Sequence, residues 1–162
     1  MKKGKERISY LKKIGLSEPI IQMAKGEILH PLFESAYEEP DYIYNEKDIP
    51  NSITPLWELD SFETVVLEED DQIVFLQFNC EDLEATFRII GYTEQATLAR
   101  IFLDIIEVSS LENDELIKQV IEASKCTGFK YTEEFISLLK LYDNDGEQYI
   151  ERFHIFQERI DW

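Results

Sequence analysis

Residues 49–106 decide the fold of this chain, and they have the sequence IPNSITPLWELDSFETVVLEEDDQIVFLQFNCEDLEATFRIIGYTEQATLARIFLDII. The stretch carries the most continuous apolar pattern in the sequence and also its densest run of acidic residues. Two runs rich in Val, Ile and Phe, at residues 62–67 and 72–79, predict two strands of a hairpin. Both runs place apolar residues on both faces, which predicts strands that are covered on both sides.

The rest of this stretch completes a sheet and adds a helix. Residues 53–59 predict a strand, in which Pro55 indicates a position near the strand start or at a sheet edge. Residues 85–90 predict another strand, and Thr93 then caps a predicted helix over 94–107 whose apolar face would lie on the sheet. We therefore expect an α+β fold, with a central, mostly antiparallel sheet packed against helices.

The preceding residues predict helices and an irregular segment. Residues 1–25 have the spacing of two N-terminal helices, one over 5–14 and a short one capped by Ser17. Residues 26–52 contain three prolines, which interrupt any long helix and predict an irregular wrap over the core with one short helix near 32–38.

The following residues, 109–162, predict a mainly helical extension. Helices are expected over 112–125 and over 132–142, with Thr132 as the cap of the second. The last segment, 147–162, suits either a helix or a strand, and its apolar spacing favours the helix. At 162 residues the whole chain, 1–162, is expected to form a single domain.

The charge of the chain is unusual. Lys and Arg number 16 against 34 Asp and Glu, a formal net charge of -18. Residues 26–84 contribute most of the excess, with 17 acidic residues against Lys47 alone. Such a charge disfavours nucleic acids and anionic membranes as partners. It favours a basic protein partner, a cation, or simple solubility.

Motifs that would indicate catalysis or a cofactor are missing from the sequence. His30, His154, Cys80 and Cys126 are scattered singly, so we expect no zinc site, no other metal and no disulfide. No phosphate-binding or dinucleotide-binding glycine motif occurs, and we expect no cofactor and no catalytic residues. The basic start is too interrupted for a signal peptide, and no run approaches the ~20 apolar residues of a membrane span, so a cytoplasmic protein is expected.

Several residues carry a resemblance to a known family. The order is Ile49-Pro50, then 53–57 (ITPLW), two apolar strands, a third strand, Gly91, and Glu94-Gln95 opening an apolar helix. Over about residues 28–108 this pattern resembles the SUKH superfamily. Its bacterial members are largely immunity proteins of polymorphic toxin systems, and it also includes fungal regulators of cell-wall synthesis. The resemblance implies an α+β fold and inhibition of a toxin by binding, without catalysis.

We interpret the acidic middle of the chain as a docking surface for a basic protein, such as a nuclease toxin domain. The candidate contact residues combine acids with aromatic anchors: Tyr42, Trp57, Glu58, Asp60, Glu68, Glu69, Asp70 and Asp71. Two alternatives stay open. One is a carboxylate-dependent hydrolase; the other is a regulatory or scaffold protein of a cell-wall or toxin-related pathway, or a homo-oligomer built through the apolar C-terminal helices.

Overall fold

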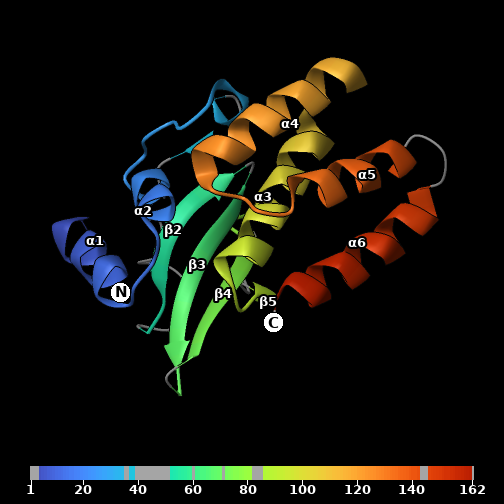
Figure 1. Cartoon of the computed structure of the whole chain (residues 1–162). Coiled ribbons are helices and arrows are strands. Elements are labelled where there is room, and N and C mark those ends of the chain that lie inside the picture. The colour runs from blue at the N-terminus through green and yellow to red at the C-terminus, as the bar shows by residue number, and fades with distance from the viewer. Residues whose placement is uncertain are drawn as a thin grey trace.

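The computed structural model confirms the α+β fold (Figure 1). The structure describes residues 4–34, 37–38, 52–59, 61–70, 72–81, 86–142 and 146–161. Its elements are, in chain order, α1 (Gly4–Lys13), α2 (Glu18–Ala24), the 3-10 helix η1 (Pro31–Phe33), β1 (Tyr37–Glu38), β2 (Thr54–Leu59), β3 (Phe62–Glu69), β4 (Gln72–Asn79), β5 (Arg88–Gly91), α3 (Glu94–Val108), α4 (Asn113–Thr127), α5 (Thr132–Tyr142) and α6 (Gly146–Ile160).

The strands form one sheet in the order β1-β2-β3-β4-β5, and all neighbours are antiparallel. The strands predicted at 53–59, 62–67 and 72–79 are confirmed, and β3 and β4 pair along their whole length. The last strand is shorter than predicted and includes Gly91. Pro55 lies near the start of β2, as expected, and the pairing with β3 is irregular between Pro55 and Trp57.

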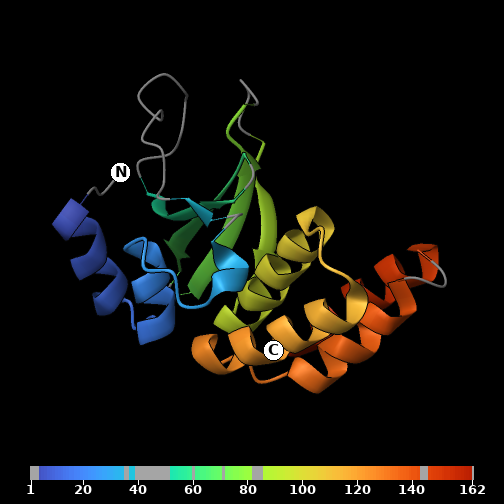
Figure 2. The same ribbon diagram turned by 90° about the horizontal axis from the view of Figure 1, so that it is seen from above.

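Both faces of the β3–β4 pair are buried, as the apolar pattern predicts. Val66 and the residue opposite it, Phe75, belong to the large core that the helices cover. Val65 and its partner Leu76 belong to a smaller cluster on the other face. Successive residues of a strand point to opposite faces, so this alternation divides the apolar residues between two clusters. Figure 2 shows α3 to α6 gathered on one side of the sheet.

The helix that follows the sheet confirms its prediction. Thr93 is the N-cap of α3, and its hydroxyl oxygen accepts a hydrogen bond from the backbone N–H of Ala96 over 3.1 Å. The apolar side of α3, including Phe102, is buried in the large core. Gly91 allows the close approach of β5 to α3, because a Cβ at this position would lie 2.6 Å from the Cβ of Ala96.

The C-terminal helices differ from prediction in one detail. α4 ends at Gly128, which adopts a left-handed φ of 75°, and the last segment is a helix, α6, as favoured. The predicted cap of α5 is wrong. Thr132 is itself the first residue of that helix, and its hydroxyl donates to the carbonyl oxygen of Phe129 over 3.2 Å.

Two expectations for the N-terminal part need correction. Ser17 occupies the N-cap position of α2 but makes no side-chain capping bond; its backbone N–H donates to Glu94 Oε1 over 2.6 Å. The short helix expected near residues 32–38 is confirmed only as a 3-10 turn that begins one residue earlier. The helical turn spans only Pro31–Phe33, and Tyr37–Glu38 is extended and pairs with Leu59 and Glu58 of β2, because β2 offers backbone groups that an added strand satisfies.

The N-terminal helices contribute to the same core as the C-terminal ones. Leu11 of α1 and Ile20 of α2 are fully buried and belong to the cluster that contains Phe102. Among the described helices, none has the combination of length and apolar character that crossing a membrane requires.

Candidate functional site

The tip of the β3–β4 hairpin carries three of the predicted contact residues. β3 continues through Glu68 and Glu69, and Glu69 pairs with Gln72. The turn therefore consists of two residues, whereas the strands predicted at 62–67 and 72–79 would leave a turn of four residues, 68–71. Asp70 has a φ of 50°, a left-handed conformation that Asp tolerates and that two-residue hairpin turns require.

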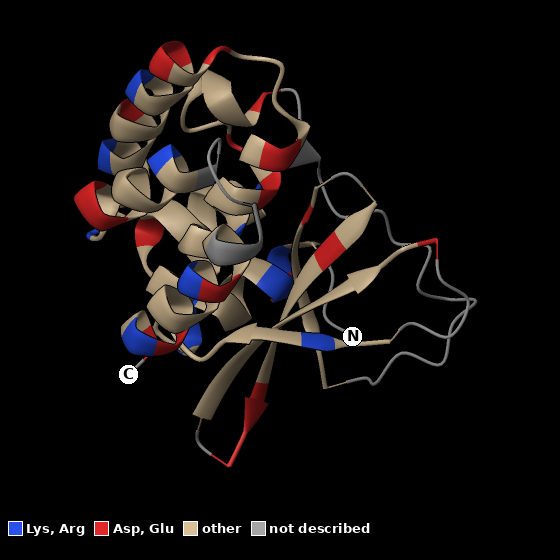
Figure 3. Ribbon diagram, turned by 90° about the vertical axis from the view of Figure 1, so that its right-hand side faces the viewer, with Lys and Arg blue, Asp and Glu red and all other residues tan. Residues whose placement is uncertain are grey.

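This acidic tip is exposed and projects from the body of the molecule, where Figure 3 shows it as a red end of the hairpin. None of Glu68, Glu69 and Asp70 forms an ion pair with another residue of the described part of the chain. Their charges are therefore not neutralised by the described surroundings. We call these three residues the acidic tip.

One contact ties the acidic tip to the N-terminal helix. The Tyr10 hydroxyl of α1 donates a hydrogen bond to Glu68 Oε2 over 2.8 Å. Partial burial, together with the hydrogen bond to Glu68 and its negative charge, raises the pKa of Tyr10 to about 12. Tyr10 was not among the predicted contact residues. The signal available was its place in the one basic segment of the chain, residues 1–13, where six Lys and Arg face Glu6 alone.

Trp57 is not available as a surface anchor. Its side chain is 0% exposed and belongs to the large core. The residue opposite it in β3 is Thr64, and both point to the face that the helices cover. The prediction of a contact through Trp57 is therefore wrong, because a fully buried ring is not accessible to another protein.

Glu58 lies in a second acidic group, away from the acidic tip. It is half-buried and stands directly opposite Glu63, which is 0% exposed. One ligand atom each of Glu58, Glu63 and Cys80 lie within 4.8 Å of one another. Carboxylates and a thiolate could coordinate a divalent cation, but each of these residues also makes other interactions within the fold. The group is consistent with a structural role.

The structure thus divides the predicted surface. Glu63 and Glu69 are six residues apart in β3, a distance of about 20 Å along an extended strand. Glu58 therefore cannot share a small contact area with the acidic tip. Tyr42, Asp60 and Asp71 lie outside the described residues.

A polar network joins α3 to the sheet, and nothing in the sequence pattern indicated it. Gln77 of β4 donates to Asp104 Oδ2 over 2.9 Å, and Arg88 of β5 donates to Gln77 Oε1 over 3.0 Å. Arg100 pairs with Asp104 over 2.5 Å. Burial raises the pKa of Asp104, an effect that Arg100 and Gln77 oppose. Because both carboxylate oxygens of Asp104 are engaged, this network holds α3 on the sheet.

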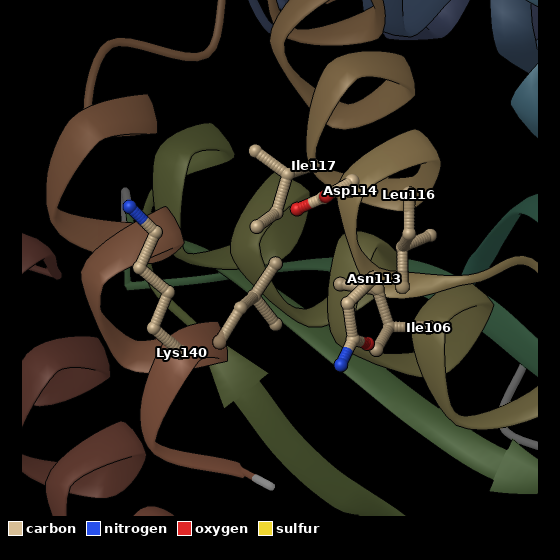
Figure 4. A pocket seen from close by; sticks show the side chains of 7 residues that line it. Ile106, Asn113, Asp114, Leu116, Ile117 and Lys140 are labelled. Atoms are coloured by element: carbon tan, nitrogen blue, oxygen red, sulfur yellow. The ribbon is translucent and has the colours of Figure 1, made fainter.

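One cavity lies among α3, α4 and α5 (Figure 4) and measures about 280 Å³. Its walls are apolar, formed by Ile106, Leu116, Ile117 and Leu139. Asn113 and Asp114 of α4 and Lys140 of α5 supply its polar groups. A carboxylate-dependent hydrolase needs two converging acids, and this cavity offers one.

Two further cavities lie on either side of α6. One is a groove of about 350 Å³ against α5, whose acid, Glu134, is ion-paired with Arg159. The other, about 190 Å³ against β5, contains Glu158 and Asp161. Asp161 Oδ1 accepts hydrogen bonds from the backbone N–H groups of Tyr92 and Thr93, over 2.6 and 2.9 Å. That carboxylate therefore serves to hold α6 at the start of α3.

Comparison with known proteins adds no further identification. No family model, no curated protein and no solved structure matches the chain. The resemblance to the SUKH superfamily therefore stays a prediction from the residues of the 28–108 stretch.

Proposed function

We propose that this protein is a non-enzymatic binding protein that docks a basic protein through the acidic tip. In line with the resemblance to the SUKH superfamily, the proposed role is that of a cytoplasmic immunity protein. Its partner would be a basic toxin domain, such as a nuclease. The proposal drops Trp57 and Glu58 from the contact surface, because the first is buried and the second lies at the other end of β3.

The proposal rests on the exposure and the uncompensated charge of the three acids. Glu68, Glu69 and Asp70 are all exposed, and no cation of the described chain neutralises them. They stand at the end of a ladder in which eight residues of β3 pair with eight of β4, which fixes their positions before a partner arrives. Concentrated charge of one sign accelerates the encounter with an oppositely charged partner and selects against wrong ones.

The described cavities support the alternative of a carboxylate-dependent hydrolase less than the acidic tip supports a binding protein. Two of the cavities described above contain a single acid each, and in the cavity against β5 Asp161 is bound to backbone N–H groups. Asp104, the described acid with a raised pKa, has both carboxylate oxygens engaged by Gln77 and Arg100.

Charge reversal at the acidic tip tests the proposal. The probe is the purified basic toxin domain encoded beside this protein's gene, and binding is measured by titration calorimetry at several salt concentrations. We expect the triple variant Glu68→Lys, Glu69→Lys, Asp70→Lys to weaken binding by at least about tenfold and to flatten its salt dependence.

A matched control places the same change of charge elsewhere. Glu107, Glu112 and Glu133 are exposed residues of the helical side, and their replacement by Lys should leave the affinity close to that of the wild type. Equal losses in the two triple variants would reduce the effect to net charge and contradict a docking site at the hairpin. The lack of a toxin gene beside this one would contradict the immunity role.

A further inference from the structure

The outer face of α6 carries an exposed aliphatic side chain where a solvated helix face would be polar. Tyr149, Phe153, Phe156 and Ile160 follow helical spacing and are buried in the core. Ile155 points away from them and is 60% exposed. An isolated exposed isoleucine needs no explanation by itself, so its surroundings decide what it indicates.

Ile155 borders the groove between α5 and α6. Leu138 of α5 and Phe156 of α6 supply the apolar lining of this groove, and Arg152 and Arg159 also line it. A small-molecule site would bury most of its ligand, whereas here a lining residue is itself 60% exposed. The groove therefore suits a protein surface better than an enclosed small ligand.

Charged residues flank Ile155 in a regular pattern. Arg152 and Arg159 lie on one side of it, seven residues apart, and Glu151 and Glu158 lie on the other side with the same spacing. With 3.6 residues per turn, each pair stands roughly 50° around the helix from Ile155. All four are exposed. Arg159 is held by Glu134 and by the ring of Phe156, and the other three form no ion pair with a described residue.

We propose that this face of α6 binds a second copy of the chain, about a two-fold axis parallel to the helix. Such an axis places Ile155 against Ile155 of the other copy, and the arginine side of each helix against the glutamate side of the other. This is the arrangement by which flanking charges select partners in parallel coiled coils. An antiparallel pairing would instead bring arginine beside arginine, so the pattern specifies the direction as well as the partner.

The groove gives the second copy room. The second α6 would lie over the groove beside α5, and the symmetry makes the contact isologous, each copy giving and receiving the same surface. α1, which contacts the acidic tip, lies at the opposite side of the molecule from α6 in both views (Figures 1 and 2). The inference is therefore independent of the proposed function, and a dimer would leave both acidic tips accessible.

The net charge sets the conditions for association. Two chains of net charge -18 each repel one another. Salt at about 0.15 M screens this repulsion beyond about 8 Å. We therefore expect a weak dimer, measured by sedimentation equilibrium at that salt concentration over a range of protein concentrations up to about 1 mM.

Ile155→Asp should weaken association by at least about tenfold. The control is Ile150→Asp, on another face of the same helix and 58% exposed, which should associate like the wild type.

Charge swaps test the pairing itself. The variant Glu151→Arg, Glu158→Arg presents arginine on both sides, and the variant Arg152→Glu, Arg159→Glu presents glutamate on both sides. Each alone should be monomeric, and an equimolar mixture should form a heterodimer. Circular dichroism and thermal melting check that all variants fold. A wild type that stays monomeric over the whole range, an equal loss in Ile150→Asp, or a mixture that does not associate would overturn the proposal.

Discussion

The two ends of β3 carry the same residue type in opposite surroundings. Glu63, near the start of the strand, is 0% exposed and faces Glu58 and Cys80. Glu69, six residues later and on the same face of the strand, is exposed at the hairpin tip. One end is part of the interior of the fold, and the other extends beyond it.

The difference shows that acidity alone does not identify a contact surface. A buried carboxylate has to be compensated by the fold, so its replacement is felt in stability. An exposed carboxylate at the end of a rigid ladder costs the fold little and remains available to a partner. The two ends of β3 should therefore respond to mutation in different assays, stability at the buried end and binding at the acidic tip.

The largest expected effect lies beside the buried end. Trp57 pairs with Thr64 next to Glu63 and is fully buried. Trp57→Ala should lower the free energy of unfolding by about 3–5 kcal/mol, through lost burial and the cavity left behind. Urea denaturation followed by circular dichroism measures it, and Trp57→Phe, which keeps a ring, should lose less.

Tyr92, an aromatic residue that is 41% exposed, is the control for this prediction, and Tyr92→Ala should change stability by less than about 1 kcal/mol. A Trp57→Ala variant that kept wild-type stability but no longer bound the basic partner would show that the ring is a surface anchor. It would contradict the burial of this end of β3.

A matched pair of substitutions compares the two ends directly. Glu63→Gln keeps the shape of the side chain and replaces a buried carboxyl group by an amide, and we expect it to cost about 1–3 kcal/mol of stability. Glu69→Gln makes the same chemical change on the same face and should stay within about 0.5 kcal/mol. Thermal and urea unfolding of both variants measure the difference. Equal losses would mean that the acidic tip is as much part of the fold as the buried end.

Local patterns were enough to predict most of the elements. The β-branched runs gave β3 and β4, and the Thr93 cap with the apolar spacing after it gave α3, because each signal lies within one element. The length of the hairpin turn could not be predicted from local patterns. Glu68 and Glu69 have low strand preference, and only their pairing with Ile73 and Gln72 makes them part of the ladder.

The candidate site was less predictable, because burial is a property of the whole fold. In the sequence, Glu58, Glu63 and Glu69 are three equivalent acids, and Trp57 is an aromatic residue beside them. The β2–β3 register decides that Trp57 faces the helices and that Glu58 meets Glu63. Tyr10 and Glu68 are 58 residues apart in the chain and meet only through the packing of α1.

The smallest expected effect concerns the bond that ties the acidic tip to the body. Tyr10→Phe removes the hydrogen bond to Glu68, and because both groups are partly solvated we expect a loss of less than about 1 kcal/mol. The pKa of Tyr10 rises from 10.0 to about 12 in the folded protein. The neutral phenol is thus favoured by folding, and its stabilising contribution is complete below pH 10.0 and lost as the pH rises toward about 12.

Unfolding of the wild type and of Tyr10→Phe should therefore differ most below pH 10.0 and converge toward pH 12, with Tyr92→Phe as a control that follows the wild type throughout. Tyr10→Phe also leaves the Glu68 carboxylate without its hydrogen bond from α1. This carboxylate is then available to a basic partner, so the affinity for that partner should be unchanged or higher. A variant that loses affinity would show that Tyr10 positions Glu68 for the partner, and the acidic tip would then depend on α1 as the buried end depends on the core.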